Sequence, residues 1–332
     1  MPKYKTVDTY IDTVGLRCVN NSKEERDYLF NTIVDFISKT KMVGVAYDKK
    51  RSTKYYQITN FQSGNTNLGT IAKGYYENST NGYNMDYYYI NINFYGLKRY
   101  HETKDDASKL LVRTIAAFLN TNTIYFGLTE LDIAMDIRSK INKILAVCIK
   151  RSANVEYFEL GDIDEDGNAI QENEGTYNIE KFESFKSKKN AMSGAYLYDK
   201  RKKELEKFNH DIGLELTRFE VKLQKRYFVK NEYGTGVMYK TLDKYAVLEF
   251  EDIKQKEILI QKYNNAKSRK QRTIVIDEAL STSNATLLRP RMDKVGNFLR
   301  ELDTVKFDAN GAFIYTKQED YLYCRSKFNR KY

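Results

Sequence analysis

The chain has 332 residues, of which 41% are hydrophobic, so it can bury a sizeable core and is not a disordered protein. Its 55 Lys and Arg against 45 Asp and Glu give a net charge of +10. This excess favours a polyanionic partner, nucleic acid first and an anionic membrane surface second. A lysine-rich surface encoded by AT-rich DNA would give the same excess, so charge alone does not decide. No apolar run reaches the roughly 18 residues of a membrane span.

The three cysteines, Cys18, Cys148 and Cys324, are scattered along the chain and form no CxxC pair. This usage argues for a reducing compartment and against a zinc module. The N-terminus has no apolar leader segment. We therefore expect a cytoplasmic protein with no membrane partner.

The first hundred residues show mainly strand patterns. Alternating apolar residues predict a strand over 4–19, and an apolar stripe after Ser22 predicts a helix over 23–39. Short strands separated by Gly, Asn and Ser turns are expected at four further places, namely 42–47, 54–61, 68–76 and 87–95.

Helices and strands continue to mix after residue 100. Thr-Lys-Asp-Asp at 103–106 has the form of a capping box and predicts the start of a second helix. A strand is expected over 123–137, followed by a helix that carries Ile141, Leu145 and Cys148. The predicted class is α+β, with a central, mostly antiparallel sheet and flanking helices.

Charge shifts sharply in the second half. Residues 155–175 carry 8 acidic and no basic residues, and a hairpin turning at Asp166-Gly167 explains them better than a calcium loop, whose twelfth position would be Asn173 instead of Glu. From about Thr241 the pattern is mostly helical. We place a boundary near 235, giving a catalytic and DNA-binding domain over 1–235 and a smaller, mainly helical region over 236–332 for origin recognition or partner contacts.

Three stretches carry residues suited to phosphodiester chemistry. The first is 130–136, where Asp132 and Asp136 share one face of an expected strand with Glu130. Such a row of oxygen ligands suits Mg²⁺ or Mn²⁺. A solvent-facing strand with acids on its outer face is the plainer interpretation of this row taken alone.

The second stretch, 194–204, opens as a strand with Tyr196 and Tyr198 on one face and turns into a basic run that begins at Lys200 and ends before Glu204. The chain contains 28 Tyr, most of which must be packing residues. In the third stretch, 216–226, the polar face of an alternating strand carries Arg218, Glu220 and Lys222. A ladder of cross-strand ion pairs is the structural alternative there.

The order of these motifs over residues 85–230 resembles the rolling-circle replication initiators, both the Rep_trans plasmid initiators and relaxases and the filamentous-phage gene II family. In those families an acidic strand precedes a strand with the nicking tyrosine, and a strand of the R-x-E type follows. The resemblance implies a core like that of the HUH nucleases, although their histidine pair is absent here. It matches Tyr198 to the nicking tyrosine and leaves Tyr196, on the same face, as the alternative nucleophile.

The resemblance also implies roles for neighbouring residues. Asp132 and Glu220, with Asp136 and His101, would hold Mg²⁺ or Mn²⁺. Lys200 and Arg218 would lower the pKa of the phenol and stabilise the charge of the transition state. DNA would be held by the remaining cations, which are Arg201, Lys202, Lys203, Lys222, Lys225 and Arg226.

The function implied is nicking of one origin strand, with a 5′-phosphotyrosine adduct and a free 3′-OH as products. Expected partners are origin or single-stranded DNA, a host helicase and a polymerase, and the chain could act as a homodimer. Two alternatives stay open. One is a relaxase that starts conjugative transfer, and the other is a non-catalytic nucleic-acid-binding protein whose Tyr87, Tyr88 and Tyr89 stack on bases.

Overall fold

A computed structural model describes residues 3–302 except 54–55, 65, 77–86, 99, 101–106, 123, 125, 150–157, 160–161, 164–168, 172–175, 180–192, 225–241 and 283, and it adds 305–307 and 313–315. The chain divides into two compact units. Unit 1 comprises Met1–Tyr10, Asp132–Arg226 and Gly236–Val295, and unit 2 is built around Ile11–Leu131. These units do not coincide with the domains predicted over 1–235 and 236–332, and the predicted boundary stays a prediction.

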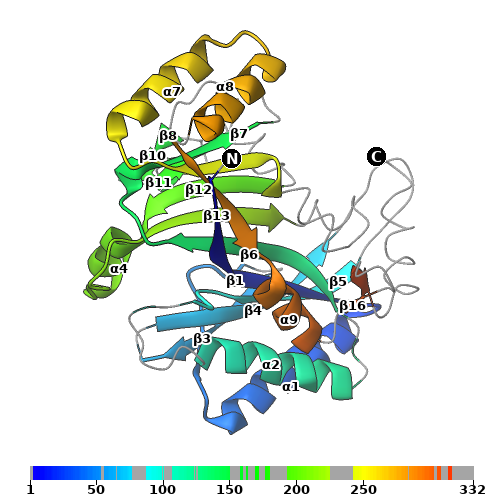
Figure 1. Ribbon diagram of the computed structural model, residues 1–332. Helices are drawn as coiled ribbons and strands as arrows, with labels where there is room; N and C mark the ends of the chain where they lie inside the picture. Colours follow the sequence, from blue (N-terminus) through cyan, green and yellow to red (C-terminus); the bar gives the residue numbers. More distant parts are fainter. Residues whose placement is uncertain are drawn as a thin grey trace. The chain divides into compact units, whose positions relative to one another are not determined.

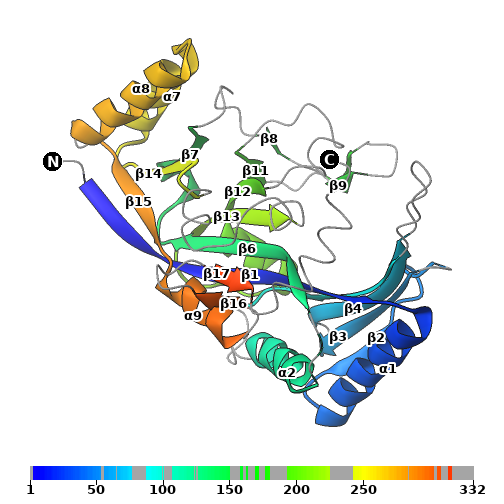
Figure 2. The same cartoon turned by 90° about the vertical axis from the view of Figure 1, so that its right-hand side faces the viewer.

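Unit 2 is an antiparallel sheet with two helices along one face (Figures 1 and 2). Its strand order is β2-β3-β4-β5-β1. The helices are held to each other by stacked rings of Phe36 and Phe118, whose centroids are 4.5 Å apart. The elements are β1 (Lys3–Asn20), α1 (Lys23–Thr40), β2 (Gly44–Tyr47), β3 (Gln57–Ser63), β4 (Thr66–Tyr76), β5 (Tyr87–Phe94) and α2 (Ala107–Thr121).

Local sequence explains where helix α1 begins. The Ser22 side chain accepts a hydrogen bond from the backbone N–H of Glu25, and the Glu25 carboxylate accepts one from the N–H of Asn21. This reciprocal cap satisfies N–H groups that the first helical turn leaves unpaired. The predicted helix begins at this cap, and the strands predicted on either side of it are confirmed, with ends shifted by a few residues.

Unit 1 contains a run of strands in the order β6-β13-β12-β11-β8. These are β6 (Gly127–Ile137), whose last six residues belong to this unit, β8 (Phe158–Glu159), β11 (Thr176–Asn178), β12 (Ser193–Asp199) and β13 (Thr217–Gln224). Helix α4 (Lys200–Phe208) follows directly on β12. The two short strands β9 (Asp162–Ile163) and β10 (Ala169–Gln171) pair antiparallel, as the hairpin prediction requires, and its turn at Asp166 lies outside the described residues.

The rest of unit 1 is a helical hairpin packed on short strands. β14 (Tyr245–Glu249) lies between β7 (Ile144–Cys148) and β15 (Thr286–Arg291), and β15 pairs in parallel with the start of β1. Helices α7 (Ile253–Asn265) and α8 (Arg269–Ser281) lie side by side and bury Leu259, Tyr263 and Ile276 against β7 and β14 (Figures 1 and 2). Helix α9 (Asp293–Glu301) begins in unit 1 and continues into unit 2 after Val295, and the antiparallel pair β16 (Val305–Phe307) and β17 (Phe313–Tyr315) belongs to unit 2.

Two predicted elements are wrong. The helix expected over Ile141–Cys148 is a short 3-10 turn, Ile141–Lys143, followed by strand β7. In the region after Thr241, which was expected to be mostly helical, Leu248 lies in strand β14. Both strands are short apolar runs that are covered on both faces, and such runs have no clear period of either two or 3.6. The α+β class with a mostly antiparallel sheet is confirmed.

Two of the cysteines, Cys18 and Cys148, are buried free thiols, and Cys324 lies outside the described residues. Among the helices that the structure describes, none has both the length and the apolar composition needed to cross a membrane.

Candidate functional site

Strands β12 and β13 bring the second and third motifs onto one face of the sheet. They pair antiparallel, with Tyr196 opposite Glu220 and Tyr198 opposite Arg218. Directly opposed residues of an antiparallel pair project from the same face, so both tyrosines share a face with the Glu and the Arg. The other face carries Leu197 and Phe219, which are buried in the core. The predicted alternation of both strands is therefore what the structure shows.

The hydroxyl of Tyr198 is held by a carboxylate. It donates a hydrogen bond to Glu220 Oε2 over 2.9 Å, a diagonal contact between the two strands. Tyr198 is only 4% exposed. The Nζ of Lys203 lies 4.0 Å from the centroid of the Tyr198 ring. The phenol is thus placed between a proton acceptor and a cation, as activation of a tyrosine oxygen would require.

Tyr196 is arranged differently, although it lies only two residues away on the same face. Its ring extends over Gly194, where a Cβ would be 3.6 Å from the Tyr196 hydroxyl. A side chain at 194 would therefore contact this ring. The hydroxyl of Tyr196 thus extends toward the beginning of β12, while that of Tyr198 lies at Glu220.

Strand β6 contributes two carboxylates from its polar face. Asp136 accepts hydrogen bonds from Arg218 through both oxygens, from Nε over 2.6 Å and from Nη2 over 2.9 Å. The Arg218 side chain is fully buried, and the Asp136 side chain is 4% exposed. Asp132, also buried, forms an ion pair with Lys222 at 3.5 Å. The buried Arg218–Asp136 pair fixes β13 to β6 beside the tyrosine.

The basic run after β12 forms the first turns of α4, which begins with Asp199 as its N-cap. Lys200 is buried and pairs with buried Glu204 over 2.5 Å. Lys202 pairs with Glu206 at 3.6 Å. These pairs have i,i+4 spacing, so the helix itself brings their members together. Lys200 therefore lies in an internal ion pair, and its expected role beside the phenol stays a prediction.

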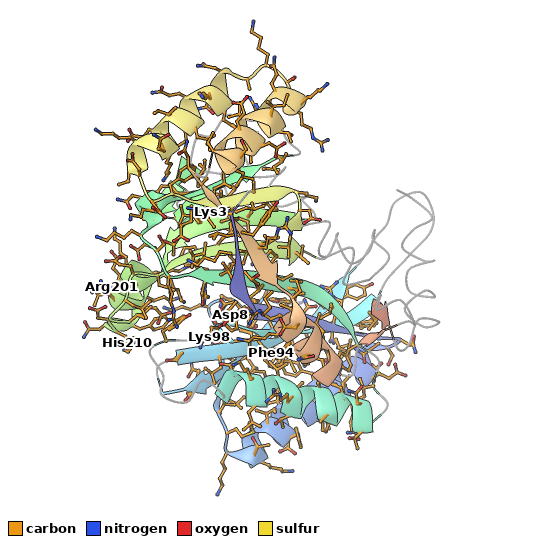
Figure 3. The ribbon with its side chains drawn as sticks, viewed as in Figure 1. Lys3, Asp8, Phe94, Lys98, Arg201 and His210 are labelled. Carbon is orange, nitrogen blue, oxygen red and sulfur yellow. The ribbon has the colours of Figure 1, made fainter. Side chains whose placement is uncertain are left out.

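Arg201, labelled in Figure 3 near His210, forms the strongest pairing of this run. Its guanidinium donates to both oxygens of Asp211, over 2.7 and 2.8 Å, and also reaches Glu215 at 3.4 Å. This hydrogen bonding holds the pKa of the Asp211 carboxyl well below its usual range and raises the pKa of Arg201. Two of the cations predicted to hold DNA, Arg201 and Lys202, are thus already paired with protein carboxylates.

Three predicted site residues, His101, Lys225 and Arg226, lie outside the described residues. Within the part of the chain that is described, no three His, Cys, Asp or Glu side chains come together as a metal site would need. The predicted metal site therefore stays a prediction, carried by Asp132 and Glu220.

A group that the sequence did not single out lies on the first residues of β1 and at the start of α9. Asp8, labelled in Figure 3, accepts hydrogen bonds from Tyr10 over 3.2 Å and from Lys294 over 3.1 Å. Burial raises the pKa of Tyr10, and the carboxylates of Asp8 and Asp136 add to this effect. The carboxylate that pairs with Arg218 thus contributes to the electrostatic environment of Tyr10. Only the fold brings these residues together, because more than 120 positions separate Tyr10 from Asp136.

The role of Lys203 was also missed. The sequence placed it with the backbone-binding cations, whereas in the structure its ammonium lies over the Tyr198 ring. The signal available was the strand-to-helix junction at Asp199, since the first turn of a helix that follows a strand directly can return over the end of that strand.

Comparisons with known proteins add little to this geometry. No protein-family model matches the sequence, and no curated protein matches it. A solved structure of a rolling circle replication initiator protein from Geobacillus stearothermophilus is similar over 82% of this chain and 96% of that chain, with 12% sequence identity and a TM-score of 0.37. Such values establish neither a common fold nor a common activity, so the core like that of the HUH nucleases remains an expectation.

Proposed function

We propose that this protein nicks one strand of DNA at a replication origin, with Tyr198 as the nucleophile, and so initiates rolling-circle replication. The observation that carries the proposal is the hydrogen bond from Tyr198 to Glu220, made beside two further carboxylates and a buried arginine on one sheet face. A nucleophile within hydrogen-bond reach of a base is the arrangement that covalent catalysis requires. The motif order described above supplies the reaction class.

In the proposed reaction, the Tyr198 oxygen attacks the scissile phosphorus while Glu220 takes the phenolic proton. A P–O bond forms to the tyrosine, and the bond from phosphorus to the 3′-oxygen breaks. The 3′-oxygen leaves and takes up a proton from water, which gives a 5′-phosphotyrosine and a free 3′-OH that a polymerase can extend, and Glu220 later returns its proton to the solvent. The reverse transfer rejoins the strand, and no oxidant or reductant takes part.

Two cations have separate roles in this proposal. Lys203 is exposed and stabilises the phenolate that develops at Tyr198, since its ammonium lies over the ring. Arg218 is a positioning residue, because its guanidinium is fully buried and bound to Asp136.

Mg²⁺ or Mn²⁺ is the expected cofactor, held by Asp132 and Glu220. The donor chemistry fits, because Mg²⁺ is commonly bound by one or two carboxylates together with water and substrate phosphate oxygens. Asp136, also predicted as a ligand, has both oxygens on Arg218 and serves that pair instead. When bound, the ion would offset negative charge on the scissile phosphate.

A covalent-adduct assay tests the proposal. The protein is incubated with Mn²⁺ and a pool of single-stranded oligonucleotides with a long randomised segment, and adducts are separated on a denaturing gel. We expect an adduct that Tyr198→Phe abolishes and that Glu220→Gln slows by roughly 10²–10⁴-fold, the usual effect of losing a general base. Chelation of the metal should also stop the reaction.

Tyr177→Phe is the matched control, because Tyr177 lies on β11 opposite Leu197 and thus on the other face of the same sheet. It should leave the adduct unchanged. Loss of the adduct with Tyr196→Phe but not with Tyr198→Phe would move the nucleophile to Tyr196. No adduct from the wild-type protein, with DNA binding intact, would favour the non-catalytic alternative.

A further inference from the structure

The turn between α7 and α8 carries a dense group of cations that the proposed nicking site does not use. We define the basic turn as Lys262, Lys267, Arg269 and Lys270, all of them exposed. Residues 262–272 contain no Asp or Glu. Among the residues that the structure describes, none of the four cations forms an ion pair or lies over an aromatic ring. Figure 3 shows nitrogen-tipped side chains around both helices of this hairpin.

The backbone of the turn is fixed by its own hydrogen bonds. Ser268 caps α8 by accepting from the N–H of Gln271 over 3.2 Å, and the Gln271 side chain accepts from the N–H of Lys267 over 2.8 Å. Arg272 is buried, donates to the carbonyl of Ala266 over 3.3 Å, and stacks on Tyr263 at 5.1 Å. The basic turn therefore presents its cations from a defined scaffold.

These cations do not stabilise the helix that carries two of them. Arg269 and Lys270 lie in the first turn of α8, which has no acidic residue. Positive charge is unfavourable at this end, where the helix dipole is itself positive. Four unpaired cations close in sequence also repel one another. A ligand with closely spaced negative charges would relieve both effects.

The composition of the turn selects among polyanions. Its one aromatic residue, Tyr263, is 1% exposed and so offers no surface on which an unpaired base could stack. Single-stranded nucleic acid is usually held by stacking of this kind, whereas duplexes are held through phosphate contacts from Lys and Arg. We propose that the basic turn binds the sugar-phosphate backbone of duplex DNA, away from the nicking chemistry. The duplex-backbone chemistry follows from the turn itself, and the choice of DNA over RNA rests on the proposed function.

Binding by fluorescence anisotropy tests the proposal without any nicking. The full-length Tyr198→Phe variant is titrated in EDTA onto a labelled duplex of arbitrary sequence, across a range of salt concentrations. Adding K267Q/R269Q/K270Q should weaken binding roughly tenfold or more at about 0.1 M salt. It should also reduce the slope of log affinity against log salt by about 2–3, since each lost phosphate contact removes about 0.9.

Two further variants separate position from charge and from folding. K23Q/K49Q/K50Q removes three exposed cations elsewhere in the chain and changes the net charge equally, so it should alter affinity less than about twofold. K267R/R269K/K270R keeps the charges and should keep both the affinity and the salt slope. Ser268 and Gln271 are untouched in every variant, and thermal melting confirms that each is folded.

Several outcomes would overturn the proposal. One is an equal loss of duplex affinity in the K23Q/K49Q/K50Q control. Another is an unchanged salt slope in K267Q/R269Q/K270Q. A third is that K267Q/R269Q/K270Q loses affinity only for single-stranded DNA, only for an RNA duplex or only for anionic lipid vesicles. An equal loss on DNA and RNA duplexes supports backbone recognition. Because the assay contains no metal and no reactive tyrosine, its failure leaves the nicking proposal standing. A failed adduct assay leaves the duplex-backbone binding standing and removes only the ground for preferring DNA to RNA.

Discussion

Helix α4 and the basic turn are two strongly basic segments of unit 1, and they use their cations in opposite ways. Every cation of the α4 run is engaged: Lys200 and Lys202 with glutamates one turn on, Arg201 with Asp211, and Lys203 with the Tyr198 ring. The basic turn has no such partner among the described residues. The α4 run therefore fixes the neighbourhood of the tyrosine, and the basic turn is left to bind an external anion.

The comparison teaches that a run of Lys and Arg is informative only together with the carboxylates around it. An arginine that already forms a bidentate ion pair binds a phosphate weakly, because a protein carboxylate accepts the hydrogen bonds that its guanidinium would donate to the phosphate. Four variants can break or sharpen this contrast, and they run from buried, paired cations to exposed ones.

The largest effect is expected from Arg218→Met. It leaves the Asp136 carboxylate buried without its guanidinium, and removing one partner of a buried ion pair costs about 3–5 kcal/mol. Urea unfolding followed by circular dichroism measures the loss. The double variant R218M/D136N should recover most of it, because no uncompensated charge remains. A loss under about 1 kcal/mol in the single variant would show that the pair does not hold β13 to β6.

Next in size is Arg272→Ala, compared with Arg269→Ala three residues earlier. Arg272 is 6% exposed and loses its bond to Ala266 and its stacking on Tyr263, so the variant should be destabilised by about 1–3 kcal/mol. Arg269→Ala should stay within about 0.5 kcal/mol of wild type, as exposed substitutions usually do. Equal losses in chemical denaturation would mean that Arg269 also holds the turn together.

A smaller change is expected in the rate of adduct formation for Lys203→Met. Loss of the ammonium over Tyr198 removes a contact of about 1–2 kcal/mol with the developing phenolate, so the rate should fall roughly tenfold. Lys202→Met is the control, because Lys202 pairs with Glu206 on the surface of the same helix. The same rate in both variants would remove Lys203 from the mechanism.

The sequence predicts the faces of these strands but not their register. Period-two alternation is enough to place Tyr196, Tyr198, Arg218 and Glu220 on polar faces. Which residue lies opposite which depends on α4 and the loop between β12 and β13, and no local rule fixes that connection. The diagonal bond from Tyr198 to Glu220 is therefore a result of the fold.

Some carboxylate partners of the α4 cations can also be predicted from the sequence, and others cannot. Lys200–Glu204 and Lys202–Glu206 are visible in the sequence as i,i+4 pairs on a helix. Asp211, which neutralises Arg201, lies beyond the end of the helix and is brought back only by the chain reversal after it. The short strands β7 and β14 were missed for a related reason, since burial on both faces removes the alternation that identifies a strand.

The smallest effect is expected from Arg201→Gln, and it tests whether an exposed, paired arginine takes part in binding. The Asp211 carboxyl has its pKa lowered by Arg201, so this pair contributes to stability above about pH 4, where the unfolded carboxyl is ionised, and the contribution is lost as the pH falls through the lowered value. In Arg201→Gln the Asp211 pKa should rise, because the largest cause of its lowering is removed while the hydrogen bond from the Gly213 N–H remains, and a carboxyl-detected NMR titration measures the rise.

Unfolding midpoints of this variant and wild type should separate above about pH 4 and converge below it, because only the ionised carboxylate gains from the arginine. Its affinity for the duplex should stay within about twofold of wild type, since Arg201 is already bound to a carboxylate. Arg269→Gln, the same substitution in the basic turn, is the matched comparison and should weaken binding and lower the salt slope by about 0.9. Equal weakening by the two variants would abolish the distinction between the two segments, since a paired arginine would then serve the DNA as well as an unpaired one.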